Sequence, residues 1–431
     1  MSLPVRQLPD APSLEAALTA LKTAAEGSCS VQLEIKNRRP VPPLAWLAAQ
    51  PSGQRLYWAD RSDQQHAGWG FADVRDHLPD HGTGCYFGGM AFDPSAETAP
   101  DWQPLGRCRF FRPRLTLRTD ATGQTLSVVC LEDGADLTGV SACVLSAAPA
   151  NIDGSISGHQ PQFAGWSAGI DRATAAFEQG TMRKVVLARQ TTVVLEDVVD
   201  PFALLSRLRQ REGFVFGFES RTGHAFIGCS PERLFQREGA LLSTEALAGT
   251  RRRGSTPQRD QALAAELRDD AKERIEHHHV VEAIEADLAP LCTELSRAAA
   301  PEIRQLQRVQ HLHTPFSGTL ADGVTSGELL AAMHPTPAVC GRPTTAARRF
   351  IRQVEPFDRG WYAGPVGWME DDQAEFAVAI RSALLVDGTL RFCTGAGIVA
   401  ASRAESEWSE LDAKSSGIVG LLAPHRAAVG S

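Results

Sequence analysis

Four residues far apart in the chain have side chains suited to acid–base and metal chemistry: Lys184, Glu232, Glu276 and Glu410. The three carboxyl groups could bind a cation or carry a proton. The lysine could accept a proton where its surroundings disfavour the charged ammonium. We interpret them as one candidate site for an anion and a metal ion, provided that the elements carrying them converge.

Lys184 opens a run of β-forming residues, Lys184–Leu195. Strand alternation places Lys184 on the same side as Val186 and Ala188. If that side faces the core, partial burial disfavours the ammonium form, as a lysine general base requires. The common alternative is a lysine at a strand end whose ammonium reaches water.

Glu232 follows Pro231 directly after two predicted strands, at 213–219 and 224–228. Proline fixes a bend, so Glu232 can project from a turn at a strand end, where site residues are common. A solvated turn glutamate paired with Arg233 explains the same residues.

Glu276 lies in the segment 259–292, whose apolar spacing predicts one long helix or two. Its apolar stripe consists of Val280, Ile284 and Leu288, and Glu276 extends it backwards. A carboxylate in such a stripe must be paired or bound to a cation. Alternatively the stripe ends there and Glu276 is exposed. The three histidines that follow point in three directions around a helix, so they cannot share one metal ion.

Glu410 stands four residues before Lys414 in the last predicted helix. A surface ion pair between the two is the simplest alternative to a metal ligand.

Groups that could bind a carboxylate occur in two further segments. Arg381 lies in the alternating segment 376–384, which predicts a strand, and Gly395, Ala396 and Gly397 follow the next strand. An arginine beside a Gly-rich turn can bind a carboxylate through its guanidinium and through backbone amides. Earlier in the chain, Gly249 and Thr250 precede three arginines, so this loop either binds an anion or is an ordinary basic surface.

Composition excludes several classes of protein. The 431 residues include 43 basic and 51 acidic ones, which gives a net charge of −8 and argues against a nucleic-acid surface or a polybasic membrane anchor. The nine cysteines are dispersed and form no C-x-x-C pair. No stretch approaches the ~20 apolar residues of a membrane span. We expect a cytoplasmic enzyme that acts on a small molecule.

The elements that position these residues can be predicted in part. Residues 30–35 alternate like a half-buried strand, and 115–131 predict a hairpin that turns at 121–123. The polar stretch 147–165 predicts a linker or long loop. A helix over 171–179 should end at Gly180.

Seven short blocks occur in the same order as in the chorismate-utilising enzymes, a family that this chain resembles over about residues 165–425. The blocks are Lys184–Arg189, Ser230–Arg233, Leu247–Thr250, Glu276-His277, His334–Val339, Glu355–Trp368 and Gly395–Val399. Residues 1–160 are similar to the family only in length and strand-rich character.

The resemblance implies an α+β fold like that of aminodeoxychorismate (ADC) synthase and anthranilate synthase component I. In it, large antiparallel β-sheets pack with peripheral helices, and the active site lies between the layers. Residues 165–425 would form the chorismate-binding catalytic domain, and residues 1–160 a strand-rich N-terminal part of the same fold.

The resemblance also implies roles for single residues. Lys184 would activate a water that attacks chorismate C2, and Glu232 would protonate the departing C4 hydroxyl. Glu276 and Glu410 would hold Mg²⁺. The substrate would be bound by Arg381, Gly395, Ala396, Gly397, Gly249, Thr250 and His311. His313 stands where the family more often has a small or apolar residue.

Within the family the chain is most similar to the isochorismate synthases, which are isomerases. The amino-transferring branches carry glutamine at the position of Lys184, and one has a nucleophilic lysine at that of Ala248. We therefore expect no glutamine amidotransferase partner, and by analogy a monomer. A salicylate synthase, which goes on to eliminate pyruvate, and an inactive chorismate-binding homologue stay open as alternatives. The pathway served, whether to menaquinone, siderophores or salicylate, also stays open.

Overall fold

The computed structural model describes residues 3–24, 29–37, 39–130, 136–145, 152–208, 213–305 and 309–422. Its 21 described strands join into one continuous sheet, in which every ladder is antiparallel except that between β1 and β2. The sheet divides at β6 (Cys108–Asp120). β4 pairs along one edge of this strand, whereas on the opposite edge β5 pairs with its first residues and β7 with its last ones. Two layers result.

The first layer runs from the N-terminal strands across the molecule. Its order is β1 (Val5–Gln7), β2 (Cys29–Ile35), β7 (Gly123–Cys130), β6, β4 (Gln65–Arg75), β3 (Arg55–Ala59), β10 (Phe214–Arg221), β11 (His224–Ser230), β20 (Ser382–Val386), β21 (Thr389–Ile398) and β9 (Lys184–Leu195), with β8 (Gly154–Gln160) and β17 (Gly341–Arg342) on the outer edge of β9.

The second layer starts from the other end of β6. Its order is β5 (Tyr86–Met90), β18 (Pro365–Glu370), β19 (Gln373–Val378), β12 (Arg233–Glu238), β13 (Leu241–Arg252) and β16 (Val309–Leu320), with β14 (Cys292–Arg297) and β15 (Glu302–Gln305) on the outer edge of β16.

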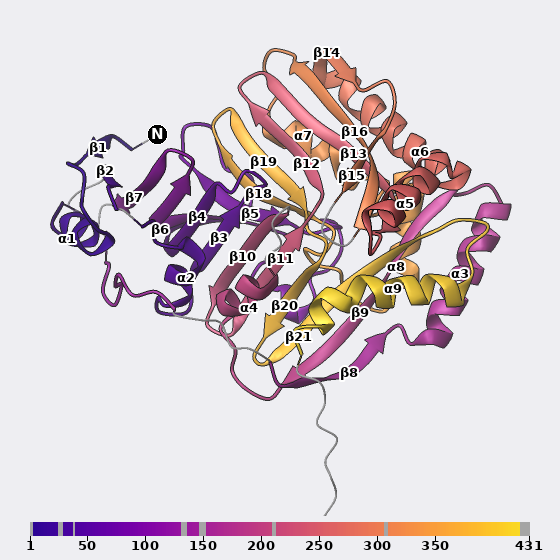
Figure 1. Ribbon diagram of the computed structural model, residues 1–431, viewed down its shortest axis with the longest axis horizontal. Coiled ribbons are helices and arrows are strands. Elements are labelled where there is room, and N and C mark those ends of the chain that lie inside the picture. Colours follow the sequence, from indigo (N-terminus) through magenta and orange to yellow (C-terminus); the bar gives the residue numbers. More distant parts are fainter. Residues whose placement is uncertain are drawn as a thin grey trace, which may run out of the picture.

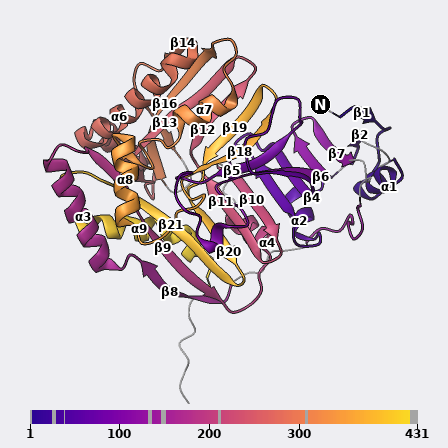
Figure 2. The ribbon, with the colours of Figure 1, turned by 180° about the vertical axis from the view of Figure 1, so that it is seen from behind.

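Helices cover the outside of both layers. Figures 1 and 2 show α3, α5, α6, α8 and α9 at the end of the molecule far from the N-terminal strands. The helices are α1 (Leu14–Ala24), α2 (Pro43–Ala48), α3 (Phe163–Glu178), α4 (Pro201–Leu208), α5 (Pro257–Asp269), α6 (Ala271–Leu288), α7 (Ser326–Met333), α8 (Thr344–Val354) and α9 (Ala404–Val419), with 3₁₀ turns at Pro100–Trp102 and Ala289–Leu291. None of the described helices has the length and apolar character needed to cross a bilayer.

The α+β class with large antiparallel sheets is confirmed, and so are most of the predicted elements. β9 has the predicted bounds, the hairpin turns between β6 and β7, and segment 259–292 forms two helices. The interpretation of 147–165 as a linker or long loop was wrong for 154–160 and for 163–165, where α3 begins, while 147–151 lie outside the residues that the structure describes. Residues 154–160 form β8, because their backbone pairs with the edge of β9 although few side chains are apolar.

Candidate active site

The two layers bring Lys184 and Glu276 together. Lys184 is the first residue of β9, and Glu276 lies on α6, which packs against β13 of the other layer. The Lys184 Nζ donates to Glu276 Oε1 at 2.6 Å. The apolar stripe of α6 is buried as predicted, and Glu276 continues it toward the lysine. Burial by itself would raise the pKa of Glu276, but the ammonium of Lys184 outweighs it, and the net shift is downward.

Strand β21 lies against this pair and leaves room beside it. A Cβ atom at Gly397 would lie 3.2 Å from Lys184 Cε and 3.5 Å from Glu276 Oε1. Gly395, two residues earlier, faces the same side. Ala396 points to the opposite side of the strand, where its methyl is buried in the core. Only the backbone of Ala396 can therefore contribute to the site.

Arg381 is close to the same space, but it does not lie in a strand as predicted. β19 ends at Val378 and β20 begins at Ser382, and Arg381 occupies the bend between them with φ +52°. This left-handed conformation interrupts the alternation of side chains along a strand, so it releases the guanidinium from the sheet face. This bend explains how an arginine in an apolar run reaches a polar site.

Glu232 is held in the turn between β11 and β12. The Ser230 Oγ accepts from the Glu232 backbone N–H at 3.2 Å, and the Val378 N–H donates to the Glu232 carbonyl at 3.0 Å. Glu232 as a whole is only 9% exposed, and the hydrogen bonds of the described residues include none to its carboxyl group. Burial raises the pKa of Glu232 to about 7, and the nearby Glu245 carboxylate adds to this shift. A buried carboxyl whose pKa lies near neutrality is suited to donate a proton.

The charged residues nearest Glu232 connect it to the other candidates. Lys184 and Arg381 both act electrostatically on the Glu232 carboxyl and oppose the effect of burial on its pKa. The predicted base, acid and carboxylate-binding arginine thus lie close enough to one another to interact electrostatically.

His311 on β16 and the Gly249 bulge of β13 form another wall. Gly249 has φ +76°, a conformation that favours glycine. The His311 Nδ1 lies 3.2 Å from the Gly249 carbonyl and 3.0 Å from Thr250 Oγ1. Burial, with a smaller contribution from Arg381, lowers the pKa of His311 to about 4. The imidazole is therefore neutral, and its buried Nε2, which has no partner in the described part of the chain, can accept a hydrogen bond.

The last helix approaches the site through Lys414. The Lys414 Nζ donates to the Gly395 carbonyl at 2.9 Å and pairs with Glu410 at 2.7 Å. Glu410 is about half exposed, as the ion-pair alternative predicts. Lys414 also acts on Glu276 and on Glu407, a buried residue whose pKa burial raises. Glu407 is a candidate that the sequence analysis did not single out.

The carboxylates fit a magnesium ion chemically. Mg²⁺ takes oxygen ligands, keeps several waters and is commonly bound by only one or two protein carboxylates, which Glu276 and Glu410 could supply. The described residues contain no cluster of three or more His, Cys, Asp or Glu that could hold a metal ion. Both carboxylates now accept from a lysine, so each would have to release it to bind the ion.

Tyr362 is a second residue that the sequence analysis missed. A Cβ atom at Gly395 would lie 3.0 Å from its hydroxyl, and burial raises its pKa. One feature of the sequence could have pointed to it: Tyr362, one of only three tyrosines, occurs inside the family block Glu355–Trp368.

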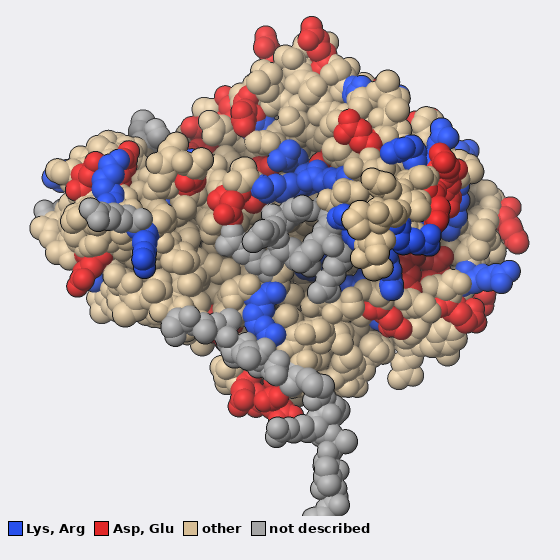
Figure 3. Space-filling model, viewed as in Figure 1, with Lys and Arg blue, Asp and Glu red and all other residues tan. Residues whose placement is uncertain are grey.

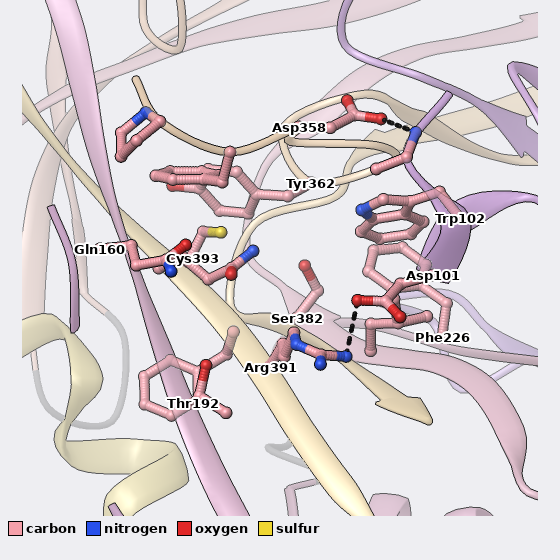
Figure 4. Close-up of a pocket in the computed structure, with 16 residues that line it drawn as sticks. Asp101, Trp102, Gln160, Thr192, Phe226, Asp358, Tyr362, Ser382, Arg391 and Cys393 are labelled. Atoms are coloured by element: carbon pink, nitrogen blue, oxygen red, sulfur yellow. Dashed lines mark hydrogen bonds and ion pairs between the residues drawn. The ribbon is translucent and has the colours of Figure 1, made fainter. Parts of the chain in front are cut away.

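Tyr362 also lines a cavity of about 370 Å³ (Figure 4). It runs along β9 and β21, where it is lined by Gln190, Cys393 and the Arg391–Asp101 ion pair (2.7 Å). It does not contain Lys184 or Glu232. Tyr362 thus lines this cavity with its side chain and contacts the site region at Gly395.

Charge on the surface is uneven although the net charge is −8. Basic side chains gather across the middle of the face seen in Figure 3, between the upper strands and α9, while acidic side chains are spread around the rim. Such a distribution favours the approach of an anionic ligand to the middle of the molecule.

Comparisons with known proteins agree with this geometry. A sequence model of the family described as "Chorismate binding enzyme" matches residues 71–423. Isochorismate synthase MenF of Bacillus subtilis is 34% identical over 356 residues, which cover 79% of this chain and 75% of the relative. The salicylate biosynthesis isochorismate synthase of Pseudomonas aeruginosa is 37% identical over 340 residues, 75% of this chain and 71% of the relative.

A solved structure has the same architecture over nearly the whole chain. The menaquinone-specific isochorismate synthase MenF from Escherichia coli superposes with a TM-score of 0.84 at 29% identity, and the match covers 94% of this chain and 99% of that one. With the family match, the two layers and the residues gathered between them, this chain belongs to the chorismate-binding enzymes.

Proposed function

We propose that this enzyme is an isochorismate synthase, which converts chorismate to isochorismate in the presence of Mg²⁺. The observation that carries the proposal is that a candidate proton donor and a candidate proton acceptor lie close together. A buried carboxyl with a pKa of about 7, Glu232, lies close enough to a lysine, Lys184, to interact with it electrostatically. The names of the relatives from Bacillus subtilis and Pseudomonas aeruginosa support the same activity.

The reaction adds water at C2 and removes the hydroxyl at C4, so it needs one proton acceptor and one proton donor. Lys184 accepts the proton of the attacking water once its own ammonium has lost a proton. Glu232 donates its proton to the C4 oxygen, which leaves as water. One water enters and one leaves, and the product is therefore an isomer of the substrate. General acid and base groups of this kind each contribute about 10²- to 10⁴-fold.

The other residues orient a substrate that carries two carboxylates. The Arg381 guanidinium and the backbone at Gly395, Ala396 and Gly397 bind the enolpyruvyl carboxylate. The neutral His311 and the Gly249-Thr250 bulge line the pocket beside it. Mg²⁺ held by Glu276 and Glu410 would supply positive charge for the ring carboxylate.

The test is incubation of the purified protein with chorismate, with Mg²⁺ or with EDTA, followed by chromatographic identification of the products. Isochorismate as the sole product, formed only with Mg²⁺, is the expected result. Salicylate with pyruvate would assign the chain to the salicylate synthases instead. Absence of any Mg²⁺-dependent product would contradict both assignments and favour a binding protein.

A further inference from the structure

The turn between β3 and β4 in the N-terminal part reaches the turn that carries Glu232. β3 pairs with β10 so that Ala59 lies opposite Val215, and β10 pairs with β11 so that Phe214 lies opposite Ser230. The end of β3, the start of β10 and the end of β11 therefore lie side by side. The Asp60 carboxylate closes the β3–β4 turn by accepting from backbone N–H groups at 2.9 and 2.8 Å.

Arg61, at the tip of this turn, binds both the backbone of the Glu232 turn and the carboxylate of Glu245. Its guanidinium donates to the carbonyl of Pro231, the residue before Glu232. It also donates to both oxygens of Glu245, at 2.9 Å for Oε2. The guanidinium lies 4.7 Å from the centre of the Phe214 ring, and the side chain is only 11% exposed.

Glu245, on β13, is held as an anion by three basic groups. Besides Arg61, it accepts from Arg304 at 3.0 Å and lies 3.1 Å from His313 Nε2. Burial would raise its pKa, but the hydrogen bonds from His313 and Arg61 lower it far below the usual range. His313 is the residue that differs from the family pattern, and its contact with Glu245 gives it a place in this network.

We propose that Arg61 and Glu245 are positioning residues for Glu232, so that the N-terminal part of the chain takes part in setting the geometry and charge of the proton donor. The proposal rests on the proposed function, because it takes Glu232 to be that donor. Neither residue needs to touch the substrate.

The pair acts in two ways. Arg61 fixes the Pro231 carbonyl, while Ser230 and Val378 fix the other backbone groups of the same turn. Glu245 provides a fixed negative charge that favours the protonated form of Glu232. The charged and titratable groups that face Glu232 are Glu245, Arg61, Lys184, Arg381 and Tyr362.

The two residues have opposite electrostatic effects on Glu232, which makes the proposal testable. Glu245 raises the pKa of Glu232 and Arg61 lowers it. Glu245→Gln should therefore move the alkaline limb of the kcat/KM profile to lower pH, and Arg61→Ala should move it to higher pH. If the two residues only stabilised the fold, their substitutions would not shift the alkaline limb in opposite directions.

The experiment compares Arg61→Ala, Arg61→Lys and Glu245→Gln with the wild-type enzyme. We expect Arg61→Ala to lower kcat about 10- to 100-fold, the range that a small misplacement of a catalytic group produces, with KM for chorismate changed less than about threefold. Arg61→Lys should recover part of the loss. If Arg61→Ala does not fold, the kcat and pH profiles of Arg61→Lys and Glu245→Gln still test the proposal.

A matched control is Arg55→Lys. Arg55 lies on the same strand, β3, and pairs with Glu219 of β10 at 2.6 Å, but at the end of the strand far from Glu232. We expect this variant to keep the wild-type kcat and pH profile. The proposal is overturned if Arg61→Ala and Glu245→Gln keep wild-type kcat and pH limbs, or if Arg55→Lys changes both to the same extent.

A second readout separates this proposal from the proposed function. The titration of the Glu232 carboxyl can be followed in the unliganded protein by infrared difference spectra between wild type and Glu232→Gln. Its midpoint should fall in the Glu245→Gln background whether or not isochorismate is formed. An unchanged midpoint would refute the charge effect of Glu245 even in an active enzyme, whereas an inactive wild-type protein would refute the proposed function alone.

Discussion

Glu232 combines deep burial with the lack of a hydrogen-bond partner among the described residues. A buried polar group without a partner destabilises a fold, and such groups are concentrated at functional sites. Because burial raises its pKa to about 7, the carboxyl is mostly neutral below that pH and there avoids the much larger free energy of burying a charge. The same property supplies the proton that the proposed reaction needs.

Replacing Glu232 with glutamine keeps the size of the side chain and removes its acidic proton. We expect kcat to fall by about 10²- to 10⁴-fold, while chorismate and Mg²⁺ still bind. Product chromatography gives the rate, and calorimetric titration gives both affinities. A variant with near wild-type turnover would remove Glu232 from the role of acid.

The raised pKa also predicts how activity depends on pH. Glu232 must be protonated to act, so kcat/KM should fall as the pH rises through about 7, the pKa of this carboxyl. Initial rates measured at low chorismate concentration in overlapping buffers will locate the limb. A profile that is level from pH 6 to 9 would contradict the assignment.

At the scale of single elements, β21 matters because two of its residues have no side chain where the site requires space. Gly397→Ala would place a methyl 3.2 Å from Lys184 Cε and 3.5 Å from Glu276 Oε1. We expect the pair to move and kcat to fall about tenfold or more, since small displacements of catalytic groups have effects of this size. Rates and thermal unfolding should be measured together.

Gly158→Ala is the matched control for this substitution. Gly158 also lies in a strand, β8, and a Cβ atom there would meet nothing within 4 Å. Its kcat should equal that of the wild type. An equal loss of kcat in Gly397→Ala and Gly158→Ala would mean that the effect does not come from crowding of Lys184 and Glu276.

Helix α9 offers a prediction about stability. Gly417 lies inside this helix with open space around its Cα. Because glycine is about 1 kcal/mol less favourable than alanine in a helix interior, Gly417→Ala should raise the free energy of unfolding by roughly 0.5–1 kcal/mol. Urea denaturation would measure the change, and a lower stability would argue against an α-helical Gly417.

The same elements show what could be predicted from the sequence. The period of apolar residues predicted α6 and placed Glu276 on its buried stripe, and β9 could be predicted from its β-branched residues. Arg381 could not be placed, because a positive φ within an apolar run leaves no local sign. β8 was missed since its pairing with β9, and not its own composition, makes it a strand.

Arg61 illustrates a further limit. It stands in an ordinary polar turn, and only the register of β3, β10 and β11 brings it to Pro231. Contacts between residues 170 positions apart are set by the order of strands in the sheet. The family blocks made Lys184, Glu232 and Glu276 recognisable, but the N-terminal part had no such block.

At the scale of the whole molecule, Arg55 joins the N-terminal strands to the rest of the sheet. It is fully buried, pairs with Glu219 at 2.6 Å and with Asp200 at 2.6 Å, and donates to the Leu47 and Gln50 carbonyls of the α2 region. Asp200 in turn accepts from the first N–H groups of α4.

Removing this arginine would leave a buried carboxylate unpaired. We expect Arg55→Ala to lower the free energy of unfolding by about 3–5 kcal/mol, as found when one partner of a buried ion pair is lost. Chemical denaturation followed by circular dichroism measures the change. A loss below about 1 kcal/mol, the usual value for a surface pair, would show that the pair is not a strong connection.

The division of the sheet at β6 also determines when the protein can finish folding. The outer edge of β5, near residue 90, is completed only by β18, which begins at Pro365, and β9 gains its long partner only from β21. A growing chain on the ribosome would therefore carry open strand edges until its last quarter has been synthesised. Open edges invite pairing between chains, and sheets with such distant partners fold slowly. Production of this enzyme should accordingly benefit from slow synthesis and from chaperones that bind exposed strands.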